Sequence, residues 1–351
     1  MSKPKPQPQL SADLSSRVLA KLTEFQRLLR DLLLQHRHPG NSAAAMHHVS
    51  RSSSADTIYA IDDVVEACMV DFFEEWSKEL PLVLIAEGLR DEHGNEGRRV
   101  FPAGCPESAA SIRILVDPID GTRELMYDKR SAWTLAGVAA NRGEQTRISD
   151  IEIAVMTELP TSKQGLADVL WAIRGTGAQA RRVDLSTGKS QPLALHPSTA
   201  QNIDHGFAMI SSFFPGTKVS AGELMEQIVQ MALGPLDVHS DTVFEDQYIS
   251  TAGQFYELIV GHDRFNADVR PLFYKMENKP EGLCCHPYDC ATLLIAQEAG
   301  VVITDALGKI LDGPMDTTTG LNWAGFANVH LRALIEPLII SYFRNHGVSA
   351  L

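Results

Sequence analysis

The hexapeptide Asp117-Pro118-Ile119-Asp120-Gly121-Thr122 holds the residues of this chain best suited to chemistry. The apolar run Ile112–Val116 before it predicts a buried strand, which should end at Pro118, because proline cannot donate to a sheet ladder. Gly121 then permits a sharp turn whose backbone N–H groups can face an anion. Two carboxylates beside such a turn suit Mg²⁺-assisted attack on a phosphate ester, although Asp-Pro and Asp-Gly are also common turn pairs.

Other carboxylates stand at the predicted ends of regular elements. The apolar run Leu82–Ala86 predicts a strand that ends at Glu87-Gly88, so a second strand delivers an acid to a turn. Asp289 comes directly before Cys290–Ala299, a small and apolar stretch that predicts a helix packed on a sheet. If these acids converge with the hexapeptide, they form a site for hard divalent cations.

The remaining sequence alternates patterns typical of helices and strands. Apolar residues recur at helical spacing from Ser11 to about His36 and again from about Ile61 to Leu80. Short apolar runs predict strands at 132–140, 151–156, 169–173, 207–212, 301–304 and 324–327. The turn Gly175–Ala178 is predicted to close a hairpin. Further helices are predicted at 221–233, 247–260 and 331–343. This alternation predicts a layered α/β structure, with a polar stretch at 184–191 separating two halves.

The composition excludes several classes of partner. At 351 residues the chain is long enough for two domains of roughly 150 residues each. Its formal net charge of −13 argues against a nucleic-acid polymer or an anionic membrane surface. A small phosphate ester stays compatible, because bound cations invert the local field of a carboxylate cluster. No apolar stretch reaches the length of a membrane span, and the polar, proline-rich residues 1–9 do not form a signal peptide.

The five cysteines indicate a reducing compartment. Their number is odd and Cys284 and Cys285 are adjacent, so they do not form a disulfide framework. Together with His286 this pair could hold a soft metal, but no second pair at finger-like spacing accompanies it. Buried thiols and a cytoplasmic location are therefore expected.

Five segments, in their order along the chain, carry a resemblance to one known family. They are Ser54-Ala55-Asp56 with Asp62, Ile85-Ala86-Glu87, the hexapeptide, Gly175–Ala178, and Tyr288-Asp289-Cys290-Ala291. In these segments the sequence resembles the inositol monophosphatases, which belong to a lithium-sensitive, magnesium-dependent class that also includes fructose bisphosphatases and bisphosphate nucleotidases. The stretches Glu298-Ala299-Gly300 and Thr304–Lys309 are similar to the family's C-terminal signature.

The resemblance implies an architecture as well as an activity. The expected fold combines α+β and α/β parts in a layered α-β-α-β-α sandwich of the sugar-phosphatase type, and the expected assembly is a homodimer. After a disordered tail at 1–10, an N-terminal α+β domain would span 11–195 and hold most metal ligands. An α/β domain would span 196–351, and the metal site would lie between the two, because Asp289 belongs to the second.

The resemblance also implies a set of ligands for two to three Mg²⁺ ions. Glu87, Asp117 and the backbone carbonyl of Ile119 would hold the first ion. Asp117 would bridge to a second ion, which Asp120 and Asp289 would complete. Glu87 would also contribute to catalysis by helping to hold a third, weaker ion. Oxygen ligands of this kind are those that Mg²⁺ prefers.

Residues beside the ligands would handle the water and the substrate. In the family pattern, Thr122 and Asp62 form a relay that orients the attacking water and accepts its proton. Asp62 could equally act as a helix N-cap or first-turn acid. Phosphate would contact the N–H groups of Gly121 and Thr122, next to Asp120, at a helix start.

Departures from the family pattern concern the substrate. Gly88 stands where a second acid is usual. Arg123 resembles the bisphosphate nucleotidase branch and could reach a second phosphate, or could be a solvated helix residue paired with an acid. Glu281 lies one residue away from the place of a substrate-hydroxyl contact.

The sequence therefore predicts a Mg²⁺-dependent phosphomonoester hydrolase that acts on a small sugar or cyclitol phosphate, most simply inositol monophosphate. One alternative is a 3'(2'),5'-bisphosphate nucleotidase, and another is a phosphatase for a small metabolite such as histidinol phosphate. The alternative outside enzymology is a degenerate member that only binds its ligand.

Overall fold

The computed structural model describes residues 10–36, 49–52, 57–91, 94–235 and 241–348. Contacts within the chain group it into two compact units. The first unit comprises Met1–Leu193, Pro287–Ile295 and Gly313–Thr319, and the second comprises Ala194–His286, Ala296–Asp312 and Gly320–Leu351. Within the described ranges, no helix is long and apolar enough to cross a membrane.

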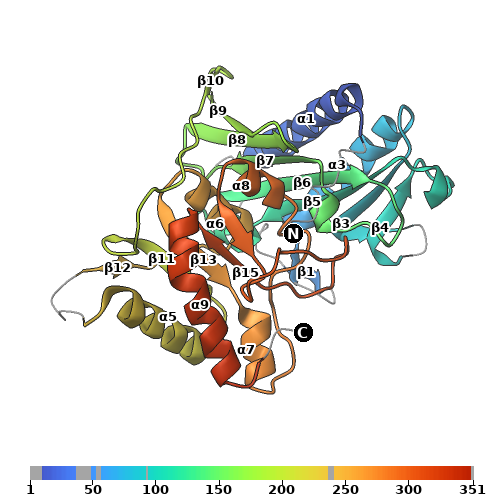
Figure 1. The fold of residues 1–351 in the computed structure, drawn as a ribbon. Helices are drawn as coiled ribbons and strands as arrows, with labels where there is room; N and C mark the ends of the chain where they lie inside the picture. Colours follow the sequence, from blue (N-terminus) through green and yellow to red (C-terminus); the bar gives the residue numbers. More distant parts are fainter. Residues whose placement is uncertain (1–9, 37–48, 53–56, 92–93, 236–240, 349–351) are drawn as a thin grey trace. The chain divides into compact units, whose positions relative to one another are not determined.

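An eight-stranded sheet forms the first unit, in the order β10-β9-β8-β7-β6-β5-β3-β4 (Figure 1). Its strands are β3 (Leu82–Arg90), β4 (Glu96–Phe101), β5 (Ile112–Asp120), β6 (Ala132–Ala140), β7 (Ile153–Leu159), β8 (Leu166–Ile173), β9 (Ala178–Asp184) and β10 (Ser190–Pro192). Neighbouring strands are antiparallel except β3 and β5, which run parallel. A separate hairpin pairs β1 (Val49–Ser52) with β2 (Thr57–Tyr59).

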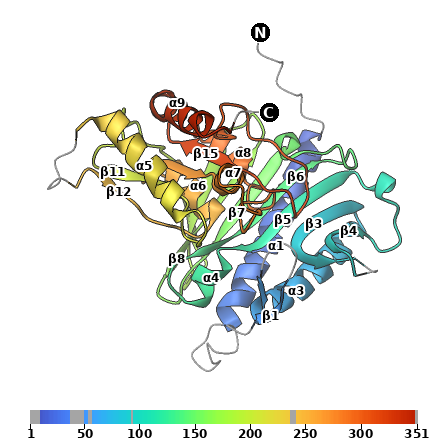
Figure 2. The ribbon, with the colours of Figure 1, turned by 90° about the horizontal axis from the view of Figure 1, so that it is seen from below.

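Helices α1 (Ala12–His36) and α3 (Ala60–Ser77) cover one face of this sheet (Figure 2). The predicted helical spacing is confirmed, since Val18, Leu22 and Phe25 of α1 are buried in the core. Alternate residues of each strand meet these helices, including Ile114 and Val116 of β5. Because side chains alternate along a strand, Asp117 faces the opposite side of the sheet.

A mixed five-stranded sheet forms the second unit, in the order β12-β11-β13-β15-β14. Its strands are β11 (Gly206–Ile210), β12 (Val243–Phe244), β13 (Asp263–Asp268), β14 (Val302–Thr304) and β15 (Trp323–Phe326). Its helices are α5 (Lys218–Leu233), α6 (Thr251–Ile259), α7 (Arg270–Met276) and α9 (Val329–Asn345), while α8 (Leu293–Glu298) is divided between the units. Helices α5 and α9 lie side by side, where the hydroxyl of Tyr342 donates to Ser220 O and Glu223 Oε2 (Figure 1).

Candidate metal centre

Two carboxylates of β5 and one from a distant part of the sequence meet in the first unit. Asp117, Asp120 and Asp289 each offer an oxygen atom that lies within 4.8 Å of the others. Asp117 and Asp120 are 2% and 5% exposed, and Asp289 is half-buried. Among the described residues this is the group of acidic, histidine or cysteine side chains with the geometry to hold a metal ion. These three residues are called the acidic cluster below.

A β-bulge brings Asp117 and Asp120 to the same face of the sheet. Asp117 pairs with Leu135 and Asp120 with Trp133, so Pro118 and the residue after it lie opposite a single residue of β6. The predicted end of the strand at Pro118 is therefore wrong. The bulge leaves one residue of the ladder unpaired, so the missing N–H of proline costs nothing there. Without the extra residue, a spacing of three would direct the two carboxylates to opposite faces.

The turn after β5 is fixed by its own side chains. Asp117 Oδ1 accepts a hydrogen bond from the N–H of Ile119 at 3.0 Å, and the Thr122 hydroxyl donates to the Ile119 carbonyl at 2.8 Å. Gly121 has φ of 97°, a left-handed conformation that favours glycine, and it caps α4 (Thr122–Met126). The carbonyl of Ile119 keeps a second lone pair, so its predicted role as a metal ligand stays compatible with this turn.

Glu87 lies beside the cluster on the neighbouring parallel strand. Ala86 pairs with Val116, so Glu87 follows at the level of Asp117. The predicted end of this strand at Glu87 is wrong, because β3 continues to Arg90 through a second irregularity. Here 86–89 lie opposite the single residue Gly97 of β4. Gly88 has φ of 73° in this bulge, which accounts for a glycine where the family pattern has an acid.

Asp289 reaches the cluster on a short segment that interrupts the second unit. The contacts of Pro287–Ile295 place it with the first unit, so all three cluster carboxylates lie in one unit. The predicted domain boundary had instead placed Asp289 in the second half of the chain. Tight turns shape the segment, with the N–H of Cys290 donating to Pro287 O and that of Ala291 to Tyr288 O, both at 3.1 Å.

Comparisons with known proteins identify the fold. No protein-family model matches this sequence, and no curated protein matches it. Among solved structures, the holo form of fructose-1,6-bisphosphatase from Leishmania major matches with a TM-score of 0.65 at 13% identity, over 97% of this chain and 100% of that one. An IMPase of Thermotoga maritima matches with a TM-score of 0.59 at 16% identity, over 94% and 100% of the two chains. The extragenic suppressor protein suhB of Bartonella henselae matches with a TM-score of 0.58 at 15% identity, over 92% of this chain and 98% of that one.

The fold is that of the inositol monophosphatases and fructose-1,6-bisphosphatases. This likeness confirms the layered α/β class predicted from the sequence. It extends over nearly the whole chain.

The electrostatics of the cluster fit a divalent cation. Burial raises the pKa of Asp117 well above its usual range, and the negative charges of Asp120, Glu87 and Asp289 raise it further. The hydrogen bond from the N–H of Ile119 only partly opposes this rise. Several carboxylates that share one buried place repel one another unless a proton or a cation joins them. An all-oxygen donor set of this kind selects Mg²⁺, Mn²⁺ or Ca²⁺ rather than a thiophilic metal, so the residues present fit magnesium.

Three other residues predicted for the site stand as follows. The backbone of Asp62 lies in the first turn of α3, but its side chain lies outside the described residues. Arg123 is half-buried in α4, beside Thr122. Glu281 belongs to the second unit, where it is exposed and accepts a hydrogen bond from Cys284 Sγ at 3.4 Å. These three roles remain predictions.

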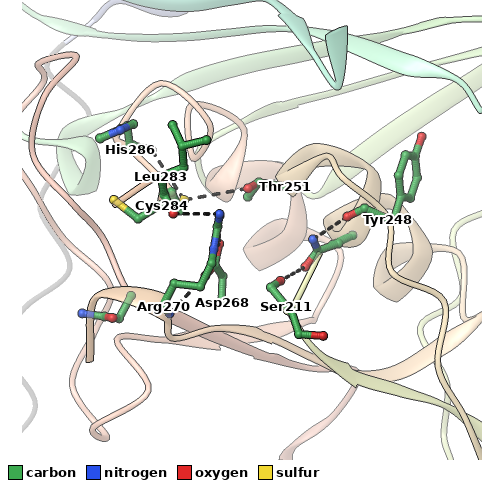
Figure 3. Close-up of polar contacts among 12 residues, drawn as sticks. Ser211, Tyr248, Thr251, Asp268, Arg270, Leu283, Cys284 and His286 are labelled. Atoms are coloured by element: carbon green, nitrogen blue, oxygen red, sulfur yellow. Dashed lines mark hydrogen bonds and ion pairs between the residues drawn. The ribbon is translucent and has the colours of Figure 1, made fainter. Parts of the chain in front are cut away.

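A buried polar network of the second unit is satisfied by its own partners (Figure 3). The Arg270 guanidinium donates two parallel hydrogen bonds to Asp268 and a third to the Leu283 carbonyl at 2.9 Å. The two phenyl rings of Phe213 and Phe214 lie under this guanidinium. A buried ion pair in which all three guanidinium nitrogens donate to protein oxygens is typical of a structural role.

Of the two free cysteines beside this network, Cys285 is buried, as predicted, whereas Cys284 is only half-buried. Cys285 is buried next to the Thr251 hydroxyl at 3.8 Å, and its own S–H donates to the His286 carbonyl at 3.6 Å. Burial and the charge of Glu281 raise the pKa of Cys284. Among the described residues, the side chains that are close enough together to hold a metal are those of the acidic cluster, and these cysteines are not part of it.

Proposed function

We propose that this protein is a Mg²⁺-dependent phosphatase that hydrolyses a phosphomonoester of a small metabolite. The acidic cluster supports the proposal: three carboxylates within 4.8 Å of one another on the fold of inositol monophosphatases and fructose-1,6-bisphosphatases. The acids of the cluster, with Glu87 and the Ile119 carbonyl, would hold the ions. When bound, Mg²⁺ supplies Lewis acidity at the phosphate and lowers the pKa of a coordinated water.

Thr122 is suited to direct the attacking water. Its hydroxyl donates to the Ile119 carbonyl, so its oxygen lone pairs remain to accept a hydrogen bond. A water that donates to this oxygen would be oriented for attack on the phosphate, and the Asp62 carboxylate would accept the proton that the water loses. Thr122→Val would remove the acceptor while keeping the side-chain shape.

The start of α4 is suited to hold the phosphate. The left-handed conformation of Gly121 directs the chain into the helix directly after Asp120, and the first N–H groups of a helix have no partner within it. Phosphate oxygens would accept from the N–H groups of Gly121 and Thr122. Arg123, next along α4, and Glu281 are proposed to select the alcohol part of the substrate.

The choice of substrate is tested by a panel. We expect the full chain with Mg²⁺ to release phosphate from inositol 1-phosphate faster than from a 3',5'-bisphosphate nucleotide or histidinol phosphate, and Li⁺ to inhibit the release. A preference for the bisphosphate nucleotide, lost in Arg123→Ala, would favour the nucleotidase alternative instead. Binding of Mg²⁺ without release from any compound would refute the enzyme and leave a binding protein. Fructose 1,6-bisphosphate belongs in the panel because of the fold.

A further inference from the structure

The segment that carries Asp289 packs on β6 at a residue without a side chain. A Cβ atom added to Gly137 would lie 2.4 Å from the carbonyl oxygen of Ala291 and 2.7 Å from Ile151 Cδ1. Both distances are well below any ordinary contact of such an atom. Gly137 does not have a left-handed φ, so the backbone itself would accept alanine. Space alone therefore requires glycine at this position.

This contact lies between two members of the acidic cluster. Gly137 pairs with Leu115, which precedes Asp117 by two residues and so points to the same face of the sheet. On the other side of the contact, Ala291 follows Asp289 by two residues in the same turn. The contact between Gly137 and Ala291 thus lies opposite a residue two before Asp117 in β5 and involves the residue two after Asp289.

We propose that Gly137 is a positioning residue for the metal centre: its missing side chain lets the segment approach closely enough for Asp289 to join Asp117 and Asp120. The inference rests on the proposed metal-dependent function. An added Cβ must gain about 1 Å to reach an ordinary contact with Ala291 O, whereas ligand distances in metal sites hold within about 0.2 Å. A shift of that size separates Asp289 from the cluster while the sheet below stays intact.

Gly137→Ala tests the proposal by metal affinity. We expect its affinity for Mg²⁺ or Mn²⁺, measured by calorimetric titration of the EDTA-stripped full chain, to fall roughly ten- to a hundredfold. At saturating metal, kcat should recover to within about threefold of wild type, because the chemical groups are unchanged. Circular dichroism of the metal-free protein should stay that of the wild type. Gly165→Ala is the matched control, since nothing lies within 4 Å of its added Cβ, and it should bind metal normally.

A second substitution separates positioning from crowding of the core. Ile151→Val removes the Cδ1 atom that meets the new Cβ, but leaves the Ala291 carbonyl in place. We expect Ile151→Val alone to bind metal normally, and Gly137→Ala with Ile151→Val to stay as weak as Gly137→Ala. Wild-type affinity in Gly137→Ala, or its rescue by Ile151→Val, would overturn the inference. If the wild-type protein itself takes up no divalent ion, the proposed function fails instead, and the two failures are distinguished.

Discussion

Asp117→Asn should abolish phosphate release and at the same time stabilise the metal-free protein. The substitution removes a carboxylate at the centre of the cluster, so the rate at saturating Mg²⁺ should fall about a thousandfold or more. It also removes a buried charge that three neighbouring acids repel, and the free energy of unfolding in EDTA should rise by about 1–2 kcal/mol. Phosphate release and urea unfolding of the same preparation measure both effects.

Asp168→Asn is the control for this prediction. Asp168 is also buried, but it accepts two hydrogen bonds of 2.7 Å from the Arg182 guanidinium, an opposite charge. Its amide variant should lose about 1–3 kcal/mol of stability and keep its activity under conditions where it is folded. The two substitutions are chemically identical and should change stability in opposite directions. Near-normal activity of Asp117→Asn, or a loss of stability like that of Asp168→Asn, would contradict the prediction.

The second large effect is an unusual dependence of stability on pH. The pKa of Asp117 is raised in the folded protein, so the folded state holds a proton that the unfolded chain would release. This acid destabilises the metal-free fold fully above the folded pKa, progressively less as the pH falls below that pKa, and not at all below the pKa of the unfolded chain. The free energy of unfolding in EDTA should therefore rise as the pH is lowered from neutral. With excess Mg²⁺ the rise should vanish, because the cation replaces the proton.

Comparison with Asp117→Asn isolates this effect. Burial also raises the pKa of Glu158 and of Glu245, so the wild-type curve contains contributions from other acids. Urea unfolding in EDTA across pH 5 to 8 gives the free energy of unfolding of the wild type and of Asp117→Asn. The difference between these two values contains the contribution of the cluster alone. The free energies of unfolding of the two proteins should approach each other toward pH 5 and separate toward neutral pH. Parallel curves would contradict a pKa of Asp117 that folding raises into or above this range.

Local patterns in the sequence were sufficient for most elements, and the resemblance to the inositol monophosphatases implied the acids of the site. The apolar spacing in α1 and the runs that form β5 and β6 each depend on residues close in sequence, and each matches the structure. The Gly175–Ala178 turn closes the β8–β9 hairpin as predicted, with Thr176 donating to Ile173 O. Asp117, Asp120 and Asp289 were all predicted as ligands, and the structure brings them together.

Features that depend on two strands at once were not predictable from one of them. The bulge at Pro118 exists because β6 offers one residue opposite two, and no pattern within β5 records that. The edge strand β4 was missed because its sequence, Glu-Gly-Arg-Arg-Val-Phe, is mostly polar, as an exposed edge requires. Gly137 carried a signal, since a glycine inside an apolar strand marks a close approach of backbone, but its partner Ala291 is distant in sequence.

The central claim is that the acidic cluster binds the divalent cations on which the reaction depends. Titration of Mn²⁺ into the EDTA-stripped full chain, followed by the electron paramagnetic resonance of free Mn²⁺, tests it directly. The wild-type protein should take up at least one ion per chain, Mg²⁺ should displace it, and Asp117→Asn should lose this uptake. Equal uptake by wild type and Asp117→Asn, or none by either, would contradict the claim.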